Sequence, residues 1–273
     1  MITVVRHLAV VLALTGVAAG ALFAQAFDHD YAAYAAVLSG HLRPPRIDYA
    51  SLKKDRTGLD EVVTALDGPA SHGESSWARE QQMAFWINAY NVFTLRVIVD
   101  HYPIRSSWFT LQPRNSIRQI DGVWTEITWL AAGRRVTLDD IEHKILRPTY
   151  SDARVHFALN CASASCPSLA AEPYRAATLD AQLDAAARAY LSSGEGLQVD
   201  GDTLRVSSIF DWYGDDFIAQ YAPLVPGSRP AKERAILGAI VRHGPPAAAA
   251  KARGGLARVR FLAYDWSLND TGR

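Results

Sequence analysis

The sequence predicts a single α+β domain in which a long buried helix packs against a small antiparallel or mixed sheet. The helix is predicted over residues 78–101, because AFWINAYNVFTLRVIV is apolar on almost every side, as in helices at the centre of a fold. The sheet is predicted from β-rich runs within residues 117–136 and 197–206, where Asp200-Gly201 is typical of a hairpin turn. No internal repeat and no interdomain linker divides the sequence, so we expect one domain.

Further elements follow from the same periodicities. Helices are predicted over Asp28–Leu42, Leu52–Leu66, Leu138–Arg147, Leu179–Leu191, Ile209–Tyr221 and Ala231–His243. Thr137 and Asp140 have the spacing of a capping box at the start of the third of these helices. We expect a buried strand over Arg154–Leu159, a final strand over Arg258–Asp265, and a loop of low complexity over residues 245–255.

The first 26 residues have the features of a secretory signal peptide. A short basic region precedes an apolar run over residues 8–23, and Ala24-Gln25-Ala26 fits the small-residue cleavage rule. The run is shorter than the roughly 20 residues that a membrane span requires, although an uncleaved anchor helix is the alternative. We therefore expect cleavage after Ala26 and a periplasmic or secreted mature chain, residues 27–273, without a membrane span.

The composition gives no electrostatic reason to expect a nucleic acid or an anionic membrane surface as partner. The 28 basic and 28 acidic residues give a formal net charge of zero. Hydrophobic residues make up 49% of the chain, so a core can form without a metal or a disulfide. We expect no cofactor, and a partner that is an unidentified protein or a ligand of the cell envelope.

Both cysteines lie in the stretch HFALNCASASCPSL, residues 156–169. Three interpretations stay open: a Cys161 nucleophile with His156 as its base, a zinc half-site, or a Cys161–Cys166 disulfide. The zinc interpretation is the weakest, since no second pair of ligands with suitable spacing is present, and we expect no metal. An oxidising compartment and a short intervening turn favour the disulfide, which needs Cα atoms about 4.4 to 6.8 Å apart.

Strand alternation bears on which of these side chains share a face. In a strand over Arg154–Leu159 that continues to Cys161, His156 and Asn160 lie on one face and Cys161 lies on the other. A direct His156–Cys161 pair therefore requires the chain to turn before Cys161, which the small residues 162–165 permit. A cysteine at such a turn, beside backbone amides, can have a lowered thiol pKa.

Three polar residues interrupt predicted apolar helix faces. Asn88 and Asn91, three residues apart, share one face of the central helix, and Glu142 falls inside the apolar stripe of the helix after Thr137. Buried amides and carboxylates need partners. The structural interpretation is hydrogen bonding to loop backbone or an ion pair. The functional interpretation is an oxyanion donor for the asparagines and, for Glu142, a carboxylate that orients a histidine.

The stretch IFDWYGDDF supplies two further candidates, Asp211 and Tyr213, which we take as binding residues. Tyr213 also fits a core position, and acidic residues are favoured near a helix start by the helix dipole. The regular series of oxygen ligands that a calcium loop needs is absent from the stretch.

Five stretches in this order resemble the bacterial exported proteins grouped as domain of unknown function 547: AFWINAYN, DDIEHKILRP, HFALNCASASCPSL, SSIFDWYGDDF and LAYDWSLN. The resemblance covers residues 27–269 and implies a single domain, usually behind a secretion signal, but no reaction. The long helix and small sheet are also similar to papain-like and transglutaminase-like cysteine hydrolases, in which the cysteine opens the central helix and the histidine follows. Here His156 precedes Cys161, so such a relationship implies a rearranged enzyme or an inactive relative that kept the cleft.

Two hypotheses of function follow. The preferred one is an exported, non-catalytic binding or scaffold domain, in which the disulfide fixes a turn beside a cleft lined by Asn88, Asn91, Glu142, His156 and Asn160. The alternative is a cysteine-dependent hydrolase acting on amide or ester bonds of envelope material. In that hydrolase Cys161 is the nucleophile, His156 is the base, and Glu142 or Asn160 orients the base.

Overall fold

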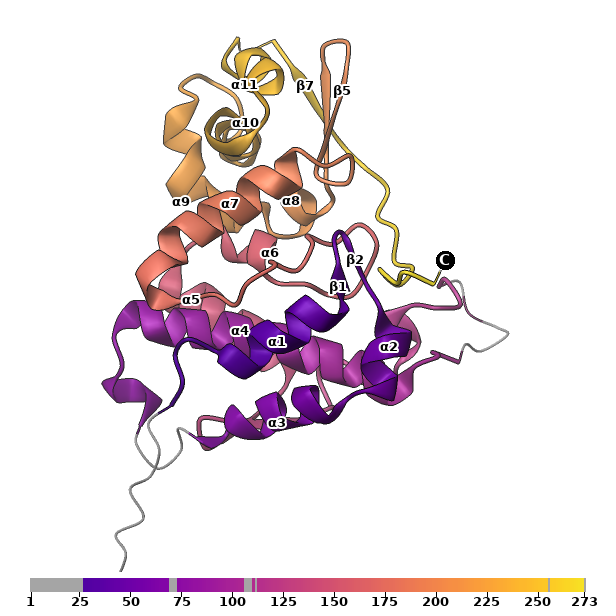
Figure 1. Cartoon of the computed structure of the whole chain (residues 1–273). Coiled ribbons are helices and arrows are strands. Elements are labelled where there is room, and N and C mark those ends of the chain that lie inside the picture. The colour runs from indigo at the N-terminus through magenta and orange to yellow at the C-terminus, as the bar shows by residue number, and fades with distance from the viewer. Residues whose placement is uncertain (1–26, 69–72, 106–109, 111, 255, 273) are drawn as a thin grey trace, which may run out of the picture.

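Helix α4 (Arg79–His101) is the long central helix that the sequence predicts (Figure 1). The structure, a computed structural model, describes residues 27–68, 73–105, 110, 112–254 and 256–272. The predicted signal peptide, residues 1–26, lies outside the described residues. Every residue of α4 from Met83 to Leu95 is buried, which agrees with a sequence that is apolar on almost every side. The α+β class is confirmed, although the expected sheet is divided into three small sheets.

Among the described residues before α4 the α-helices are α1 (Ala32–His41), α2 (Tyr49–Lys54) and α3 (Thr57–Ala65). A small hairpin of β1 (Leu42–Arg43) and β2 (Arg46–Ile47) joins α1 to α2. The single helix predicted from Leu52 to Leu66 is therefore wrong. Asp48 caps α2 by accepting a hydrogen bond from the Ser51 amide, and Asp55 then leaves the helical conformation before α3 begins.

A second hairpin and a π-helix follow α4 and carry part of the site. The β-rich stretch within residues 117–136 forms only β3 (Trp129–Ala131) and β4 (Arg134–Val136), and Trp129 stacks on Phe93 of α4. The predicted capping box is confirmed, since Thr137 and Asp140 bond reciprocally to each other's backbone amides. It opens a π-helix over Asp140–Leu146, continued by α5 (Arg147–Tyr150).

The stretch before the cysteines is helical, so the strand predicted over Arg154–Leu159 is wrong. It forms α6 (Val155–Ala158), a single turn that Asp152 initiates by accepting a hydrogen bond from the Arg154 amide. A short apolar run has no periodicity that separates a buried strand from a buried helix, so tertiary packing decides between them. The assignment of His156 and Asn160 to one strand face and of Cys161 to the other therefore does not apply.

The C-terminal half adds a second helical layer and a three-stranded sheet. Its elements are α7 (Leu179–Leu191), β5 (Leu197–Asp200), β6 (Thr203–Val206), α8 (Ile209–Trp212), α9 (Ile218–Tyr221), α10 (Ala231–His243), α11 (Pro246–Arg253) and β7 (Arg258–Phe261). The hairpin at Asp200-Gly201 is confirmed, and β7 pairs with β6 in parallel. None of the helices in the described part of the chain has the length and apolar character that a membrane span requires.

Two of the C-terminal predictions are wrong. The helix predicted over Ile209–Tyr221 is divided into α8 and α9 by a 3₁₀ turn over Gly214–Phe217. The loop predicted over residues 245–255 contains α11, in which Pro246 occupies the first helical position and alanines follow.

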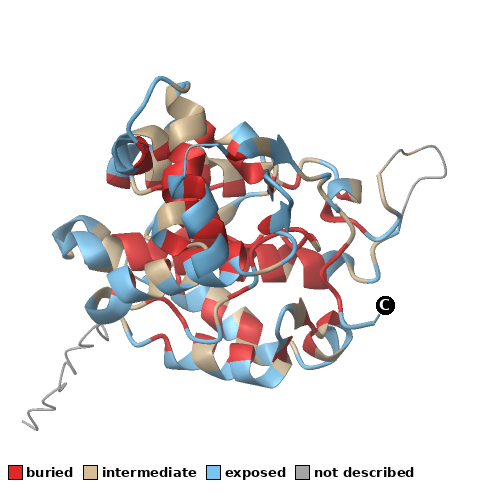
Figure 2. Ribbon diagram, turned by 90° about the horizontal axis from the view of Figure 1, so that it is seen from above, coloured by how far each residue is buried: buried red, intermediate tan, exposed pale blue. Residues whose placement is uncertain are grey.

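The described chain has two apolar clusters, and the site lies where they meet. One cluster surrounds α4, while the other is formed mainly by α7, α10 and β6. Buried residues accordingly gather along the inner helix faces (Figure 2). From β7 the chain returns along the molecule to end near β1 and β2, where Ile47 pairs with Asp270 (Figure 1). This return segment, residues 262–272, passes the cysteine loop, because Ser163 pairs with Leu268.

Candidate functional site

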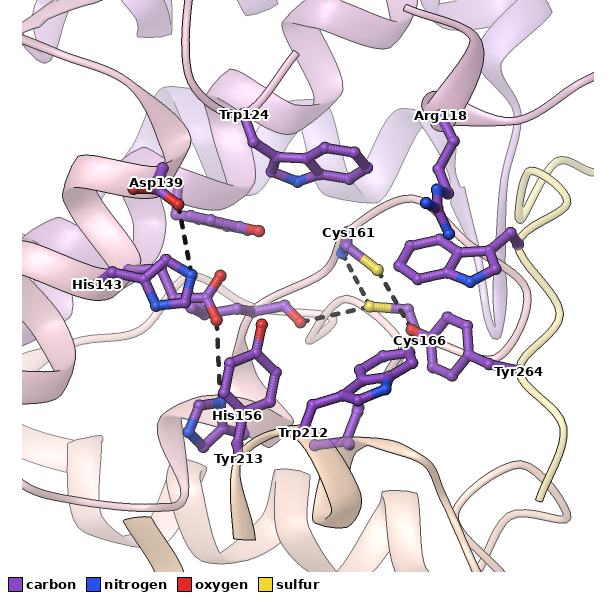
Figure 3. Close-up of a pocket in the computed structure, with 15 residues that line it drawn as sticks. Arg118, Trp124, Asp139, His143, His156, Cys161, Cys166, Trp212, Tyr213 and Tyr264 are labelled. Atoms are coloured by element: carbon purple, nitrogen blue, oxygen red, sulfur yellow. Dashed lines mark hydrogen bonds and ion pairs between the residues drawn. The ribbon is translucent and has the colours of Figure 1, made fainter. Parts of the chain in front are cut away.

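A pocket of about 500 Å³ lies between the two apolar clusters (Figure 3). Its lining comes from six segments: Tyr90, Arg118, Trp124, Asp139, Glu142, His143, His156, Leu159, Cys161, Cys166, Ile209, Trp212, Tyr213, Tyr264 and Trp266. In Figure 3 Asp139 and His143 lie on one side, Arg118 and Tyr264 lie on the other, and Cys161 lies between them. The pocket therefore has a charged wall and an aromatic wall with a thiol between them.

Cys161 is half-buried and its sulfur faces hydrogen-bonding groups of its own loop and of the return segment. Its Sγ lies 3.1 Å from the Ser163 Oγ and 3.3 Å from the Tyr264 hydroxyl. Ser163 also donates to the Tyr264 oxygen at 3.0 Å, which ties the loop to the return segment. The turn begins at Ala162, which has a positive φ of 61°.

The predicted Cys161–Cys166 disulfide is wrong for this structure, because both cysteines are free thiols. They are nevertheless in contact: the Cys161 amide donates to the Cys166 Sγ at 2.8 Å. Cys166 is buried and its thiol points to the Leu159 carbonyl, 3.6 Å away. The hydrogen bond from the Cys166 amide to the Ser163 carbonyl closes the turn, so the turn holds its shape without a covalent bond.

The pKa values of the two thiols are shifted in opposite directions. The hydrogen bond from Cys166 is the largest of the effects that lower the pKa of Cys161, and with those from Ser163 and Tyr264 it brings that pKa to about 7 despite burial. Burial raises the pKa of Cys166 well above its ordinary value. Cys161 is thus the more acidic of the two thiols.

The charged wall is one chain of hydrogen bonds and ion pairs. Its members, in order of contact, are Asp139, His143, Arg147, Asp216, His156 and Glu142. Arg147 bonds Asp216 through both Nε at 2.6 Å and Nη2 at 3.1 Å, and donates to the His143 Nδ1. Each member of this chain thus contacts at least one other member, so none of these partly buried groups is left without a partner.

His156 is held at the centre of this chain by two carboxylates. Its Nε2 lies 2.7 Å from Asp216 and its Nδ1 lies 4.0 Å from Glu142. The Tyr213 ring covers the imidazole at a centroid distance of 4.3 Å, so His156 is only 4% exposed. Because Tyr213 covers its ring, His156 affects a ligand in the pocket mainly by positioning the Glu142 carboxylate.

The two carboxylates beside His156, those of Asp216 and Glu142, lie in different environments. Although burial opposes it, the hydrogen bonds from His156 and Arg147 hold the pKa of Asp216 well below its usual range. Burial, and then the negative charge of Glu142, raises the pKa of Tyr213 above its usual value. Glu142 is the carboxylate that lines the pocket, and Asp216 lies behind it as the partner of His156 and Arg147.

The predicted pairing of His156 with Cys161 does not occur as a hydrogen bond among the described residues. The polar side chains that contact the Cys161 sulfur are Ser163 and Tyr264. Both His156 and Cys161 nevertheless line the pocket, together with Glu142 and Tyr213. The structure thus brings four of the predicted site residues into one cavity, with the thiol and the imidazole on different parts of its wall.

The three asparagines lie behind the cavity rather than in its lining. Asn88 bonds both backbone groups of Tyr174, and Asn91 accepts from the Asn160 amide while donating to the Ala158 carbonyl. Asn160 donates to the Pro167 carbonyl and accepts from the Ala162 amide. These bonds fix the backbone on both sides of the cysteines, so the amides hold the loop rather than a ligand.

Asp211 is exposed and does not line the pocket; its carbonyl accepts from Lys232, and its amide donates to the Ser208 carbonyl. The residues that sequence reasoning missed are Asp216, Tyr264, Arg118 and the tryptophans of the lining. Two signals could have found some of them: Asp216 lies in the same stretch as Tyr213, and LAYDWSLN contains Tyr264 and Trp266.

In the described part of the chain, no three His, Cys, Asp or Glu side chains converge as metal ligands.

Residues 74–191 match the model of a family described as protein of unknown function, DUF547. This matched region contains α4, the π-helix, α6 and both cysteines, whereas Tyr213, Asp216 and the return segment lie beyond it. No curated protein and no solved structure matches the chain.

Proposed function

We propose that this chain, which matches the DUF547 family model over residues 74–191, is an exported cysteine-dependent hydrolase of amide or ester bonds in envelope material. The observation that carries this proposal is the free Cys161 thiol in the pocket wall, whose pKa is lowered to about 7. The thiolate is the nucleophilic form of cysteine, and about half of such a thiol is ionised at neutral pH. A cysteine that served only packing would gain nothing from this ionisation.

The proposed reaction begins when the Cys161 sulfur attacks the carbonyl carbon of the substrate. A carbon–sulfur bond forms and the carbonyl electrons move to oxygen, where the Tyr264 hydroxyl beside the sulfur is placed to donate a hydrogen bond. Collapse of this intermediate breaks the bond to the departing nitrogen or oxygen, which takes a proton from the charged wall. His143 lines that wall, with its Nε2 3.5 Å from Asp139, and is the group placed to supply the proton.

A water molecule completes the reaction by attacking the thioester. The carbon–sulfur bond breaks, the carboxylic acid leaves, and the thiolate is restored. The proton lost by the water returns to the group that supplied the first one, so the site ends in its starting state. In this sequence His156 is a positioning residue, because it contacts Glu142 and Asp216 and has no recorded contact with the sulfur.

A non-catalytic binding domain is the second candidate. The observation that favours it is that no described histidine forms a hydrogen bond with Cys161, so the base found beside most cysteine nucleophiles is missing. In that case the thiol is part of a ligand-binding wall. The two candidates differ in whether Cys161 becomes acylated.

Alkylation and acylation of the native protein test the proposal. Iodoacetamide should add one label to the native protein, at Cys161, with a rate that is half-maximal near pH 7 and falls about tenfold per pH unit below that. p-Nitrophenyl acetate should release a burst of about one p-nitrophenolate per chain and leave an acetyl group on Cys161, read by peptide mass spectrometry. A native protein that takes no label, or a labelled protein without any burst, would contradict the hydrolase and favour the binding domain.

Export is part of the same proposal and rests on residues 1–26. If the signal peptide is cleaved as the sequence predicts, the mature protein begins at Phe27. N-terminal sequencing of protein recovered from the periplasmic or culture fraction of the producing bacterium checks this. An intact residue 1 in membrane-bound protein would show an anchor instead.

A further inference from the structure

The aromatic wall of the pocket is a cluster of four rings from three separate segments. We use this name for Trp124, Trp212, Tyr264 and Trp266. Trp212 stacks on Trp266 at 5.7 Å and an interplanar angle of 21°, and Tyr264 lies 4.8 Å from Trp212 and 4.6 Å from Trp266. Because Tyr264 also contacts the Cys161 sulfur, this cluster adjoins the reactive atom.

Trp212 is the exposed member of the cluster. It is 47% exposed, whereas the other described tryptophans are buried or half-buried. Large indole surfaces are normally covered, and an exposed one at the mouth of a pocket indicates a surface that contacts a ligand. The side chain has no metal, thiol or proton-transfer role in the proposed reaction, so binding is the task it can perform.

The charges around the cluster limit what the ligand can be. The Arg118 guanidinium lies 4.8 Å from the Trp266 ring centre and disfavours a second cation on the aromatic wall. Asp139 and Glu142 on the opposite wall disfavour an anion in the cavity. A neutral ligand with an apolar face and a polar rim meets both conditions, since hydroxyl groups donate to carboxylates and accept from a guanidinium.

We propose that the aromatic wall is a subsite for a neutral sugar ring, with the C–H face of a pyranose against Trp212 and its hydroxyl groups toward Arg118 and Asp139. An unsubstituted aromatic ring has no rim groups for those charged side chains, whereas a sugar ring carries several hydroxyl groups, which favours the sugar. The proposal names the substrate class of the same pocket, an acylated sugar whose acyl carbon faces Cys161, and in that respect it rests on the proposed hydrolase. Binding of the sugar ring itself can be measured without any reaction.

The test uses tri-N-acetylchitotriose as the probe and the purified protein. Titration followed by tryptophan fluorescence and by calorimetry should give a dissociation constant below about 1 mM. Trp212→Ala should weaken binding by about tenfold or more. Phe261→Ala is the matched control, because Phe261 is an aromatic side chain of similar exposure, 45%, that does not line the pocket, and its affinity should equal that of the wild type.

Iodoacetamide labelling of Cys161 in the same samples separates the two proposals. Saturating trisaccharide should slow labelling in the wild type and in Phe261→Ala, but not in Trp212→Ala. Absence of binding at 10 mM probe (about ten times the expected limit), or equal binding by Trp212→Ala and the wild type, would overturn the sugar subsite even where Cys161 reacts normally. Binding by a protein whose thiol is inert would overturn the hydrolase and leave the subsite standing.

Discussion

Replacing Cys161 with serine is expected to abolish both the p-nitrophenolate burst and iodoacetamide labelling of the native protein. A serine hydroxyl stays protonated at neutral pH, whereas half of the Cys161 thiol is ionised at its pKa of about 7. Loss of a nucleophile typically lowers turnover by about 10³-fold or more. The measurement is the rate of ester hydrolysis at pH 7, with circular dichroism and urea unfolding to show that the fold persists.

Cys166 supplies the matched control, because it is the second thiol of the same loop. Cys166→Ala keeps the nucleophile but removes the hydrogen bond that contributes most to the low pKa of Cys161. We expect labelling still to occur, with its midpoint moved upward toward about 8.5, the value of an unperturbed thiol, and a rate at pH 7 that falls by about tenfold. Cys166→Ser retains a hydroxyl donor, so its midpoint should stay closer to that of the wild type.

Two results would contradict these expectations. Ester hydrolysis that survives in Cys161→Ser would place the nucleophile elsewhere. An unchanged labelling midpoint in Cys166→Ala would mean that Ser163 and Tyr264 alone hold the thiolate, and that the second thiol has no part in its activation.

Asp216→Asn is expected to lower the free energy of unfolding at pH 7 by about 2 kcal/mol. The carboxylate accepts charge-assisted hydrogen bonds from Arg147 at 2.6 Å and from His156 at 2.7 Å. An asparagine oxygen at the place of Oδ2 could still accept from both groups, but these bonds would lose the carboxylate charge, and the NH₂ group at the place of Oδ1 would face the Arg147 Nη2 donor. The Cys161 labelling rate should remain within about twofold, because the groups that activate the thiol are on the aromatic side of the pocket. Urea unfolding and labelling on the same sample provide the two measurements.

The destabilisation should depend on pH in a defined direction. The pKa of Asp216 is lower in the folded state than in the unfolded state, where it is about 3.9. Its contribution to stability is therefore fully present above the unfolded pKa and is lost as the pH falls below it. The difference between wild type and Asp216→Asn should shrink by about 1 kcal/mol between pH 5 and pH 3, with solvent screening of this partly exposed group reducing the change.

Asp215→Asn controls for the general effect of removing an acidic residue at this place in the chain. Asp215 is exposed and adjacent in sequence, so its replacement should change the unfolding free energy by less than about 0.5 kcal/mol at either pH. Equal effects of the two substitutions would show that the ion pairs of Asp216 contribute nothing specific.

Long periodic segments were the most predictable part of the fold. Helices α4, α7 and α10 lie within a residue of the predicted bounds, because each carries its own apolar pattern over at least three turns. Short elements were predicted poorly. The stretch Val155–Ala158 is helical and not a strand, since four buried residues are too few to distinguish the two periods and the surrounding packing decides.

The candidate site, like the fold, was only partly predictable from the sequence. Burial of Glu142 could be predicted, because a carboxylate inside an apolar helical stripe must be paired. Its indirect partner Asp216 could not, since it lies far along the chain and reaches His156 only when the turn over Gly214–Phe217 packs against α6. The disulfide was predicted from proximity in sequence and compartment, but the folded loop satisfies both thiols by hydrogen bonds instead.

The amino-acid pattern alone was sufficient for the α+β class, the buried central helix, and the prediction that Glu142, His156, Cys161 and Tyr213 matter to one site. These properties depend on local periodicity and on the chemistry of single side chains. The partners of those residues depend on chain segments that meet only in the folded state: Asp216 and Arg147 bind in the charged wall, and Tyr264 reaches Cys161 from the return segment. Tertiary packing therefore decided that the thiol faces hydrogen-bond donors and aromatic rings rather than the histidine five residues before it, because hydrogen-bond contact requires proximity in space and not in sequence.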